Sequence, residues 1–209
     1  LLLESCSNDP CGDVTVTSDY NFDLLSDGCG YTGSLTVTYT ITDQCNNSAQ
    51  EMATFTIVDT TSPNSNCDPE DDTVECVGDV PAADPLLITD EADNCGTPTV
   101  TFTGDVSDGN TCPEVITRTY TLTDSCGNTT DLVQTITIDD TTPPLGTGPA
   151  NLTVECIGDV PAQNVADVTG VSDNCTAVPT VNFISDVSDG NTCPETITRT
   201  YEIVDDCGN

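Results

Sequence analysis

Residues 115–138 decide the fold of this chain. They read Val115-Ile-Thr-Arg-Thr-Tyr-Thr-Leu-Thr123, then Asp124-Ser-Cys-Gly-Asn128, and finally Leu132-Val-Gln-Thr-Ile-Thr-Ile138. The two outer segments alternate with a period of two and are rich in Thr, Val and Ile, which is typical of β-strands. The Gly and Asn of the middle segment accept a positive φ angle, so this segment predicts a hairpin turn. Further short strands between Gly, Pro, Asn and Asp turns favour a small antiparallel β-sandwich.

The hairpin belongs to a unit that recurs along the chain. Cys76, Cys95, Cys112 and Cys126 are followed by Cys156, Cys175, Cys193 and Cys207, at offsets of 80, 80, 81 and 81 residues. Cys11, Cys29 and Cys45 fit a partial third copy, in the places of Cys95, Cys112 and Cys126. Such a frame predicts a tandem array of units that contact only their neighbours.

Two proline-containing linkers divide the units. Asp59-Thr-Thr-Ser-Pro63 and Asp139-Asp-Thr-Thr-Pro-Pro144 each follow the last strand of a unit, where proline ends the ladder. The frame predicts a partial repeat at residues 1–63 that lacks its N-terminal strands. It also predicts a complete repeat at 64–144, and a repeat at 145–209 that lacks its last strand. We therefore expect the chain to be a fragment of a longer protein.

Composition excludes several classes of function. Two Arg, no Lys and no His stand against 36 acidic residues, and the formal net charge is −34. This charge excludes nucleic acid and anionic membranes as direct partners and predicts cations, with a generally solvated acidic surface as the alternative. Only carboxylate pairs remain for acid–base chemistry, so we predict that the chain is not an enzyme. No apolar run is long enough to span a bilayer.

The cysteines indicate where the protein resides. The chain has 13 Cys, no C-x-x-C pair and no His to complete a zinc site. Such cysteines predict disulfides and therefore an oxidising, extracellular or cell-surface location.

The motifs resemble a known family. The chain has a Val-Glu-Cys strand, an Asp-Asn-Cys loop, a Thr-Arg-Thr-Tyr-x-x-x-Asp-x-Cys-Gly-Asn hairpin and a terminal Asp-Thr-Thr-Pro-Pro. This order resembles the immunoglobulin-like HYR-type repeats, and more closely the repeats of giant surface adhesins and gliding-motility proteins of the Bacteroidota. The resemblance implies an all-β fold of tandem immunoglobulin-like antiparallel β-sandwiches, disulfide-stapled and arranged end to end, on a cell surface or in a secreted fibre. It implies no ligand.

The geometry of a seven-stranded sandwich suggests a disulfide pattern. Its second-to-third and sixth-to-seventh strand loops share one pole, which predicts the bridges Cys11–Cys45, Cys95–Cys126 and Cys175–Cys207. The opposite pole predicts Cys76–Cys112 and Cys156–Cys193. Four cysteines allow three connectivities, so this pattern is one of three. Of the remaining Cys6, Cys29 and Cys67, the first two could pair, and Cys67 could bond to another chain or to a partner outside this segment.

The same pole also receives the linker from the preceding repeat, so acidic residues gather there. We expect Asp59 to meet Asp93 and Asp124 at one junction, and at the next junction Asp139, Asp140, Asp173, Asp205 and Asp206 to converge. Carboxylates about 4 Å apart repel each other, and Ca²⁺, which accepts roughly 6 to 8 oxygen ligands, would remove that repulsion. The alternative is that these residues only form turns and solvated loops.

These observations predict an extracellular structural repeat protein, an adhesin stalk or filament made rigid by calcium between its repeats and by disulfides. Its expected partners are calcium and either neighbouring copies or the continuation of the same chain, with strand complementation at an unfinished sandwich. The alternative is a carbohydrate- or ice-binding module, since Thr36-Val-Thr-Tyr-Thr-Ile-Thr42 alternates hydroxyl groups along a strand.

Arg118 and Arg199 occupy equivalent places in the repeat. For both, the preferred interpretation is a cross-strand pair with a carboxylate.

Overall fold

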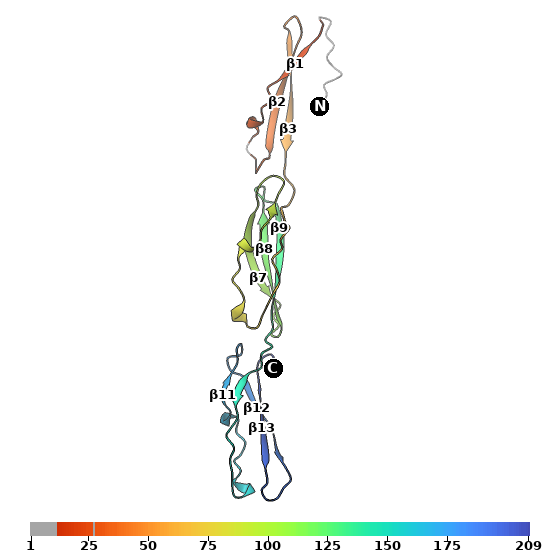
Figure 1. Cartoon of the computed structure of the whole chain (residues 1–209). Helices are drawn as coiled ribbons and strands as arrows, with labels where there is room; N and C mark the ends of the chain where they lie inside the picture. The colour runs from red at the N-terminus through yellow and green to blue at the C-terminus, as the bar shows by residue number, and fades with distance from the viewer. Residues whose placement is uncertain (1–11, 27) are drawn as a thin grey trace. The chain divides into compact units, whose positions relative to one another are not determined.

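A computed structural model describes residues 12–26 and 28–209 (Figure 1). Within these residues the regular elements are β-strands and short 3-10 helices, with no α-helix, so the all-β prediction is confirmed. The antiparallel sheets are consistent with a β-sandwich. The chain divides into two compact units, one of residues 1–67, 85–101 and 121–132 and the other of 68–84, 102–120 and 133–209. The repeat limits 1–63, 64–144 and 145–209, and their end-to-end array, remain predictions.

The first unit contains a three-stranded antiparallel sheet of order β1-β2-β3. Its strands are β1 (Thr15–Ser18), β2 (Gly33–Thr42) and β3 (Ser48–Ile57), and a 3-10 helix, η1 (Phe22–Leu24), lies between the first two. The turn between β2 and β3 closes because the Asp43 carboxylate accepts hydrogen bonds from the backbone N–H and the side-chain amide of Asn47, both 2.7 Å long. Two short strands, β4 (Asn64–Ser65) and β6 (Glu91–Ala92), pair with each other.

The hairpin predicted for residues 115–138 is confirmed. It consists of β8 (Glu114–Thr123) and β9 (Thr129–Ile138), with Gly127 in the turn at a φ of 87°. These strands belong to a sheet of order β5-β9-β8-β7, completed by β5 (Asp72–Val74) and β7 (Thr99–Ser107). β5 runs parallel to β9, an arrangement that the alternation pattern did not predict. A parallel neighbour requires a long crossover, here the chain between β5 and β9.

The second unit carries β10 (Leu145–Thr147) paired with β11 (Thr169–Ser172), and β12 (Thr180–Ser188) paired with β13 (Ile197–Val204). It also contains the 3-10 segments η2 (Val77–Asp79), η4 (Ile157–Asp159) and η5 (Val165–Asp167). By the sequence repeat, η2 corresponds to η4, and η5 corresponds to η3 (Pro85–Leu87) of the first unit. The repeated sequence therefore produces repeated local structure.

A small apolar core lies under the β5–β9 pair. Ile116, Ile136 and Ile138 are buried, and Val74 and Val80 pack against them. Because β-branched side chains on alternating positions share one face of a strand, the period-two pattern places Ile136 and Ile138 together.

The two arginines make the cross-strand pairs that the sequence favours. Arg118, only 4% exposed, donates to both carboxylate oxygens of Asp105 at 2.9 Å and to the carbonyl oxygen of Pro81. Arg199 makes the same bonds to Asp186 and Pro161. Both basic side chains of the protein are therefore neutralised locally.

The disulfide pairing differs from the prediction. The structure bonds Cys29 to Cys126, Cys76 to Cys175 and Cys112 to Cys207, with Cα–Cα distances of 4.8, 5.1 and 5.4 Å. The predicted bridges Cys76–Cys112, Cys95–Cys126 and Cys175–Cys207 are therefore wrong, and Cys156 and Cys193 are free and exposed rather than bonded to each other. Cys29 is also unavailable to Cys6, and Cys67 is free. Cys11, the predicted partner of Cys45, and Cys6 lie outside the described residues.

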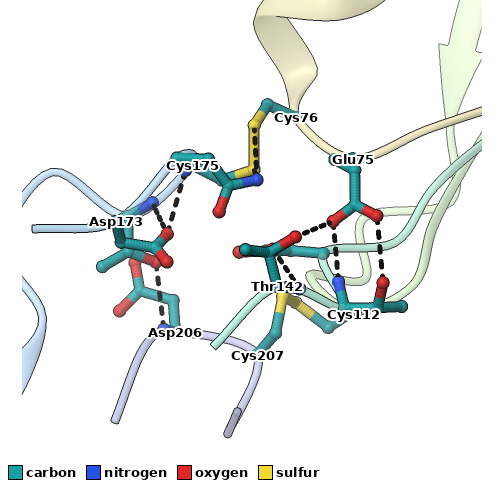
Figure 2. The surroundings of a disulfide bond; sticks show 12 residues. Glu75, Cys76, Cys112, Thr142, Asp173, Cys175, Asp206 and Cys207 are labelled. Atoms are coloured by element: carbon teal, nitrogen blue, oxygen red, sulfur yellow. Dashed lines mark hydrogen bonds between the residues drawn. A yellow bond between two sulfur atoms is a disulfide. The ribbon is translucent and has the colours of Figure 1, made fainter. Parts of the chain in front are cut away.

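The error has a geometric cause. The prediction assigned Cys76 and Cys112 to one pole of a sandwich, and Figure 2 shows both residues in one cluster of loops. The same cluster, however, contains Cys175 and Cys207, which the linker of residues 139–144 brings to it from the following repeat. The bonds therefore join successive repeats instead of closing each repeat on itself.

Candidate metal centre

Three aspartates in the second unit form what we call the buried acidic cluster: Asp140, Asp173 and Asp205. One carboxylate oxygen from each lies within 4.8 Å of the other two. Asp140 follows β9, Asp173 follows β11 and Asp205 follows β13, so each stands at the end of a strand. Strand ends that open into loops can turn their carboxylates toward a common point, as the sequence predicts for this pole.

Each aspartate uses one oxygen to hold its own loop. Asp140 accepts from the N–H of Thr142 at 3.1 Å. Asp173 accepts from two consecutive backbone N–H groups, those of Cys175 at 2.9 Å and Thr176 at 2.7 Å. Asp205 accepts from Cys207 at 2.9 Å and Asn209 at 2.8 Å. Side-chain-to-backbone bonds of this kind close Asx turns, and they fix the direction of the second oxygen.

The second oxygen of each aspartate is buried and has no hydrogen-bond partner: Asp140 Oδ2, Asp173 Oδ1 and Asp205 Oδ2. The Asp140 and Asp205 residues are only 5% and 7% exposed. Buried carboxylate oxygens without partners are unfavourable and rare in native proteins, and an ion or water usually accounts for them. Since Arg118 and Arg199 are engaged elsewhere, a compensating positive charge has to come from solution.

The carboxyl groups of the cluster differ in proton affinity. Burial raises the pKa of Asp140, and the negative charges of Asp173 and Asp205 raise it further, against the hydrogen bond from Thr142. Burial also acts to raise the pKa of Asp205, but its hydrogen bonds from Asn209 and Cys207 outweigh burial and leave this pKa lowered. The ionised form of Asp140 is therefore the one that most needs a counter-ion.

A related group lies in the first unit. Ligand atoms of Asp59, Asp124 and Cys126 lie within 4.8 Å of one another, although the Cys126 sulfur is bonded to Cys29 and is no thiolate. Asp59 Oδ2 and Asp93 Oδ1 are buried without partners, whereas Asp124 uses both oxygens within its own turn. This group offers fewer unpaired oxygens than the buried acidic cluster.

The predicted ligands are thus brought together in part. Asp140, Asp173 and Asp205 form one group, and Asp59 and Asp124 are close in another. Asp139 and Asp206 are outside the first group: the Asp139 N–H donates to the Val74 carbonyl oxygen at 2.9 Å, and Asp206 is exposed. Asp93 does not belong to the second group. Its Oδ2 accepts a hydrogen bond from the backbone N–H of Cys95. Metal binding by any of these residues remains a prediction.

Glu75 also takes part in this region. Its carboxylate accepts from the Thr141 N–H and hydroxyl, both at 2.9 Å, and from the Thr142 hydroxyl at 3.2 Å (Figure 2). These bonds lower the pKa of Glu75 and tie down the linker that carries Asp140. The recurrence of Val-Glu-Cys at residues 74–76 and 154–156 was the sequence signal that could have pointed to Glu75.

A second contact that the sequence did not predict is made by Asn209. Its side-chain amide donates to the Asp140 carbonyl oxygen at 2.6 Å, and Asn128 makes the equivalent bond to Asp59 at 3.4 Å. The repeated Cys-Gly-Asn motif therefore closes a turn in both places and also holds the linker beside it.

Comparison with known proteins finds one family match. Residues 64–138 match the family model described as a HYR-like domain with 4 cysteines. The chain matches no protein with a curated description. HYR-like domains are non-enzymatic, adhesion-type modules. The match and the disulfides support an extracellular or secreted module of this type at residues 64–138. Within the described residues, no helix has the length and hydropathy to cross a membrane. Residues 64–138 are therefore similar to a HYR-like domain, and we call this segment the HYR-type repeat.

Proposed function

We propose that this chain is a structural segment of an extracellular stalk or filament, in which disulfides and a bound calcium ion hold successive repeats rigidly together. The adhesion-type family match gives the general class of protein. The loops around Asp140 supply the specific mechanism, because covalent bonds and unpaired carboxylates occur there side by side.

The observation that carries the proposal is the set of unpaired oxygens in the buried acidic cluster. Asp140, Asp173 and Asp205 each offer a carboxylate oxygen within 4.8 Å of the other two, and each has one buried oxygen without a hydrogen-bond donor. Calcium accepts several carboxylate and water oxygens in loose geometry, at roughly 2.3–2.6 Å. Magnesium demands a tighter octahedral shell, and zinc prefers His and Cys ligands, so calcium suits this donor set best.

The disulfides complement the ion. Cys76–Cys175 and Cys112–Cys207 both cross from the HYR-type repeat to the segment that follows residue 144 (Figure 2). Two covalent crossings restrict relative rotation more than one does, and an ion bound by Asp140, Asp173 and Asp205 would tie the linker to both neighbouring loops. Such a joint transmits tension along a fibre without unfolding.

Calorimetric titration of the whole chain with calcium tests this function. We expect saturable binding that Asp173→Asn weakens at least tenfold, because asparagine keeps the acceptor for the loop N–H groups and loses the charge. Asp79→Asn removes the same charge from an exposed position outside the cluster and serves as the matched control. Equal binding by the wild type and Asp173→Asn, or no binding at millimolar calcium, contradicts the proposal.

A further inference from the structure

Hydrogen bonds join the three segments that carry the buried acidic cluster. The side-chain amide of Asn209 donates to the Asp140 carbonyl oxygen at 2.6 Å. The Asp206 N–H donates to the Thr176 hydroxyl at 3.1 Å. These two bonds join the turn of the cluster's third aspartate to the linker that carries the first and to the loop that carries the second.

Glu75 attaches the linker to the end of β5. Its carboxylate accepts hydrogen bonds from the Thr141 N–H and hydroxyl, both at 2.9 Å, and from the Thr142 hydroxyl at 3.2 Å (Figure 2). The Thr142 N–H in turn donates to the Asp140 carboxylate at 3.1 Å. The direction of the Asp140 side chain therefore depends on the contact between Glu75 and the linker.

The Cys76–Cys175 disulfide closes these contacts into a ring around the cluster. Cys76 follows Glu75 directly in the chain, and the Cys175 N–H donates to the Asp173 carboxylate at 2.9 Å. The segment that holds the linker is thereby bonded to the loop that carries Asp173. This joint of the ring is covalent, whereas the other joints are the hydrogen bonds just described.

The Cys112–Cys207 bond lies outside this ring. Cys207 belongs to a turn that closes by its own hydrogen bonds, since Asp205 accepts from the N–H groups of Cys207 and Asn209 and donates its N–H to the Asn209 carbonyl oxygen. Cys112 is adjacent in sequence to no member of the cluster. One disulfide therefore constrains two ligand-bearing segments against each other, and the other attaches a turn that is already closed.

We propose that the Cys76–Cys175 disulfide controls the affinity of the buried acidic cluster for calcium, so that its reduction releases the ion. The inference rests on the proposed function, in which this cluster binds calcium. With the ring open, the loop of Asp173 is free to move away from the other two carboxylates, which repel it. The oxidised ring holds the three carboxylates together at the spacing that the ion requires.

The reduction is a thiol–disulfide exchange with a small dithiol. The dithiol gives up two electrons and two protons and forms its own disulfide, while Cys76 and Cys175 become thiols. Both cysteines are half-buried, so a small reagent reaches them from solution. The side-chain amide of Asn174 donates to the sulfur of Cys175 at 3.1 Å and to that of Cys76 at 3.7 Å, and such a donor stabilises the thiolate that leaves.

The coupling acts in both directions. If calcium binds the disulfide form about tenfold more tightly than the dithiol form, saturating calcium must favour the disulfide by the same factor. For this two-electron couple, tenfold corresponds to about 30 mV. Bound calcium therefore protects the bond against reduction, and loss of calcium exposes it.

Calorimetric titration of the whole chain with calcium, without reductant, is the first test. We expect Cys76→Ser/Cys175→Ser to bind calcium about tenfold more weakly than the wild type. Cys112→Ser/Cys207→Ser is the matched control, because it removes the disulfide outside the ring and should weaken binding much less. Equal weakening in both double variants overturns the inference, since it would reflect a general loss of rigidity.

The two proposals fail in different ways in this titration. A wild type that binds no calcium overturns the proposed function and this inference with it. A wild type and Cys76→Ser/Cys175→Ser that bind calcium equally overturn the inference alone and leave the proposed function in place.

A redox equilibrium of the wild type needs no cysteine variant. The chain is equilibrated in mixtures of reduced and oxidised dithiothreitol with calcium or with EDTA, then alkylated, cleaved at Asp and analysed by mass spectrometry. We expect calcium to raise the dithiol-to-disulfide ratio of the reagent that half-reduces Cys76–Cys175 by about tenfold. Asp173→Asn should abolish this shift. A ratio that calcium leaves unchanged in the wild type, or that shifts equally in Asp173→Asn, overturns the inference.

Discussion

Cys112 is bonded to Cys207, 95 residues further along the chain, with a Cα–Cα distance of 5.4 Å. Cys29, which corresponds to Cys112, is bonded in the same way to Cys126, which corresponds to Cys207. The same pairing thus occurs twice between equivalent positions of successive repeats. It is a property of the repeat and not of one local contact.

Disulfide mapping by mass spectrometry checks this pairing directly. Trypsin cuts poorly because the chain has two Arg and no Lys, so a protease that cleaves at Asp is the suitable reagent. We expect the non-reduced digest to contain the peptide of Cys112 joined to that of Cys207, and the peptide of Cys76 joined to that of Cys175. A fragment joining Cys76 to Cys112 would show that the bonds close each repeat separately.

Removal of the Cys112–Cys207 bond should destabilise the protein. The double variant Cys112→Ser/Cys207→Ser should lose about 2–4 kcal/mol of unfolding free energy, because the unfolded chain regains entropy that the cross-link removed. Urea unfolding monitored by circular dichroism measures the loss. Cys193→Ser is the control, since Cys193 occupies the place of Cys112 in the next repeat but is free and exposed. A shift of similar size in the control would argue against a role for the bond.

Asp140→Asn and Asp205→Asn should have opposite effects in EDTA at neutral pH. The first removes a buried charge that Asp173 and Asp205 repel, so the melting temperature should rise. Asp205→Asn weakens the hydrogen bonds that residue 205 accepts from the N–H groups of Cys207 and Asn209, so the melting temperature should fall. With calcium added, both variants should lose the increase in melting temperature expected for the wild type. A calcium response retained by Asp140→Asn would place the ion elsewhere.

The pH dependence of stability without divalent ions follows from the direction of the Asp140 shift. The folded state holds this proton more tightly than the unfolded state, whose carboxyl has the ordinary pKa of 3.8. Stability contributed by protonated Asp140 is therefore present at low pH and is lost as pH rises from that value through the raised pKa. In EDTA, the wild type should lose stability relative to Asp140→Asn over this window. A difference that stays constant with pH contradicts the assignment.

Asp205 contributes with the opposite sign, because its pKa is lowered in the folded state. Its stabilisation is present above the ordinary value and is lost as pH falls through the lowered pKa. The wild type should therefore lose stability relative to Asp205→Asn only at the acid end of the titration, and reversible urea unfolding at several pH values separates the two groups.

Replacement of Arg118 should cost more than replacement of Arg199. Arg118→Met leaves Asp105 without its partner and should lower the unfolding free energy by about 3 kcal/mol, at the lower end for a buried pair because Asp105 is 33% exposed. Arg199→Met breaks the same pair at a more exposed site and should cost clearly less. Urea unfolding of both variants tests the order, and equal losses would show that burial does not govern the strength of the pair.

Local pattern was enough for much of the fold. The hairpin around Gly127 could be predicted because period-two alternation and a turn residue with positive φ act within a few residues. The parallel pairing of β5 with β9 could not, because Asp72 and Ile136 are 64 residues apart and the alternation of either strand says nothing of its neighbour's direction. The convergence of Asp140, Asp173 and Asp205 was predictable from the pole that their loops share, whereas their unpaired oxygens depend on side-chain orientation.

The amino-acid sequence by itself determined the repeat frame, the all-β class, the acidic character and the number of cysteines that compete for partners. Only the tertiary structure decided which cysteines bond, because equivalent residues are chemically identical and a disulfide forms only where two Cα atoms come within about 4.4–6.8 Å. That distance depends on how a proline-containing linker brings the loops of one repeat to those of the next, which no local pattern of residues contains.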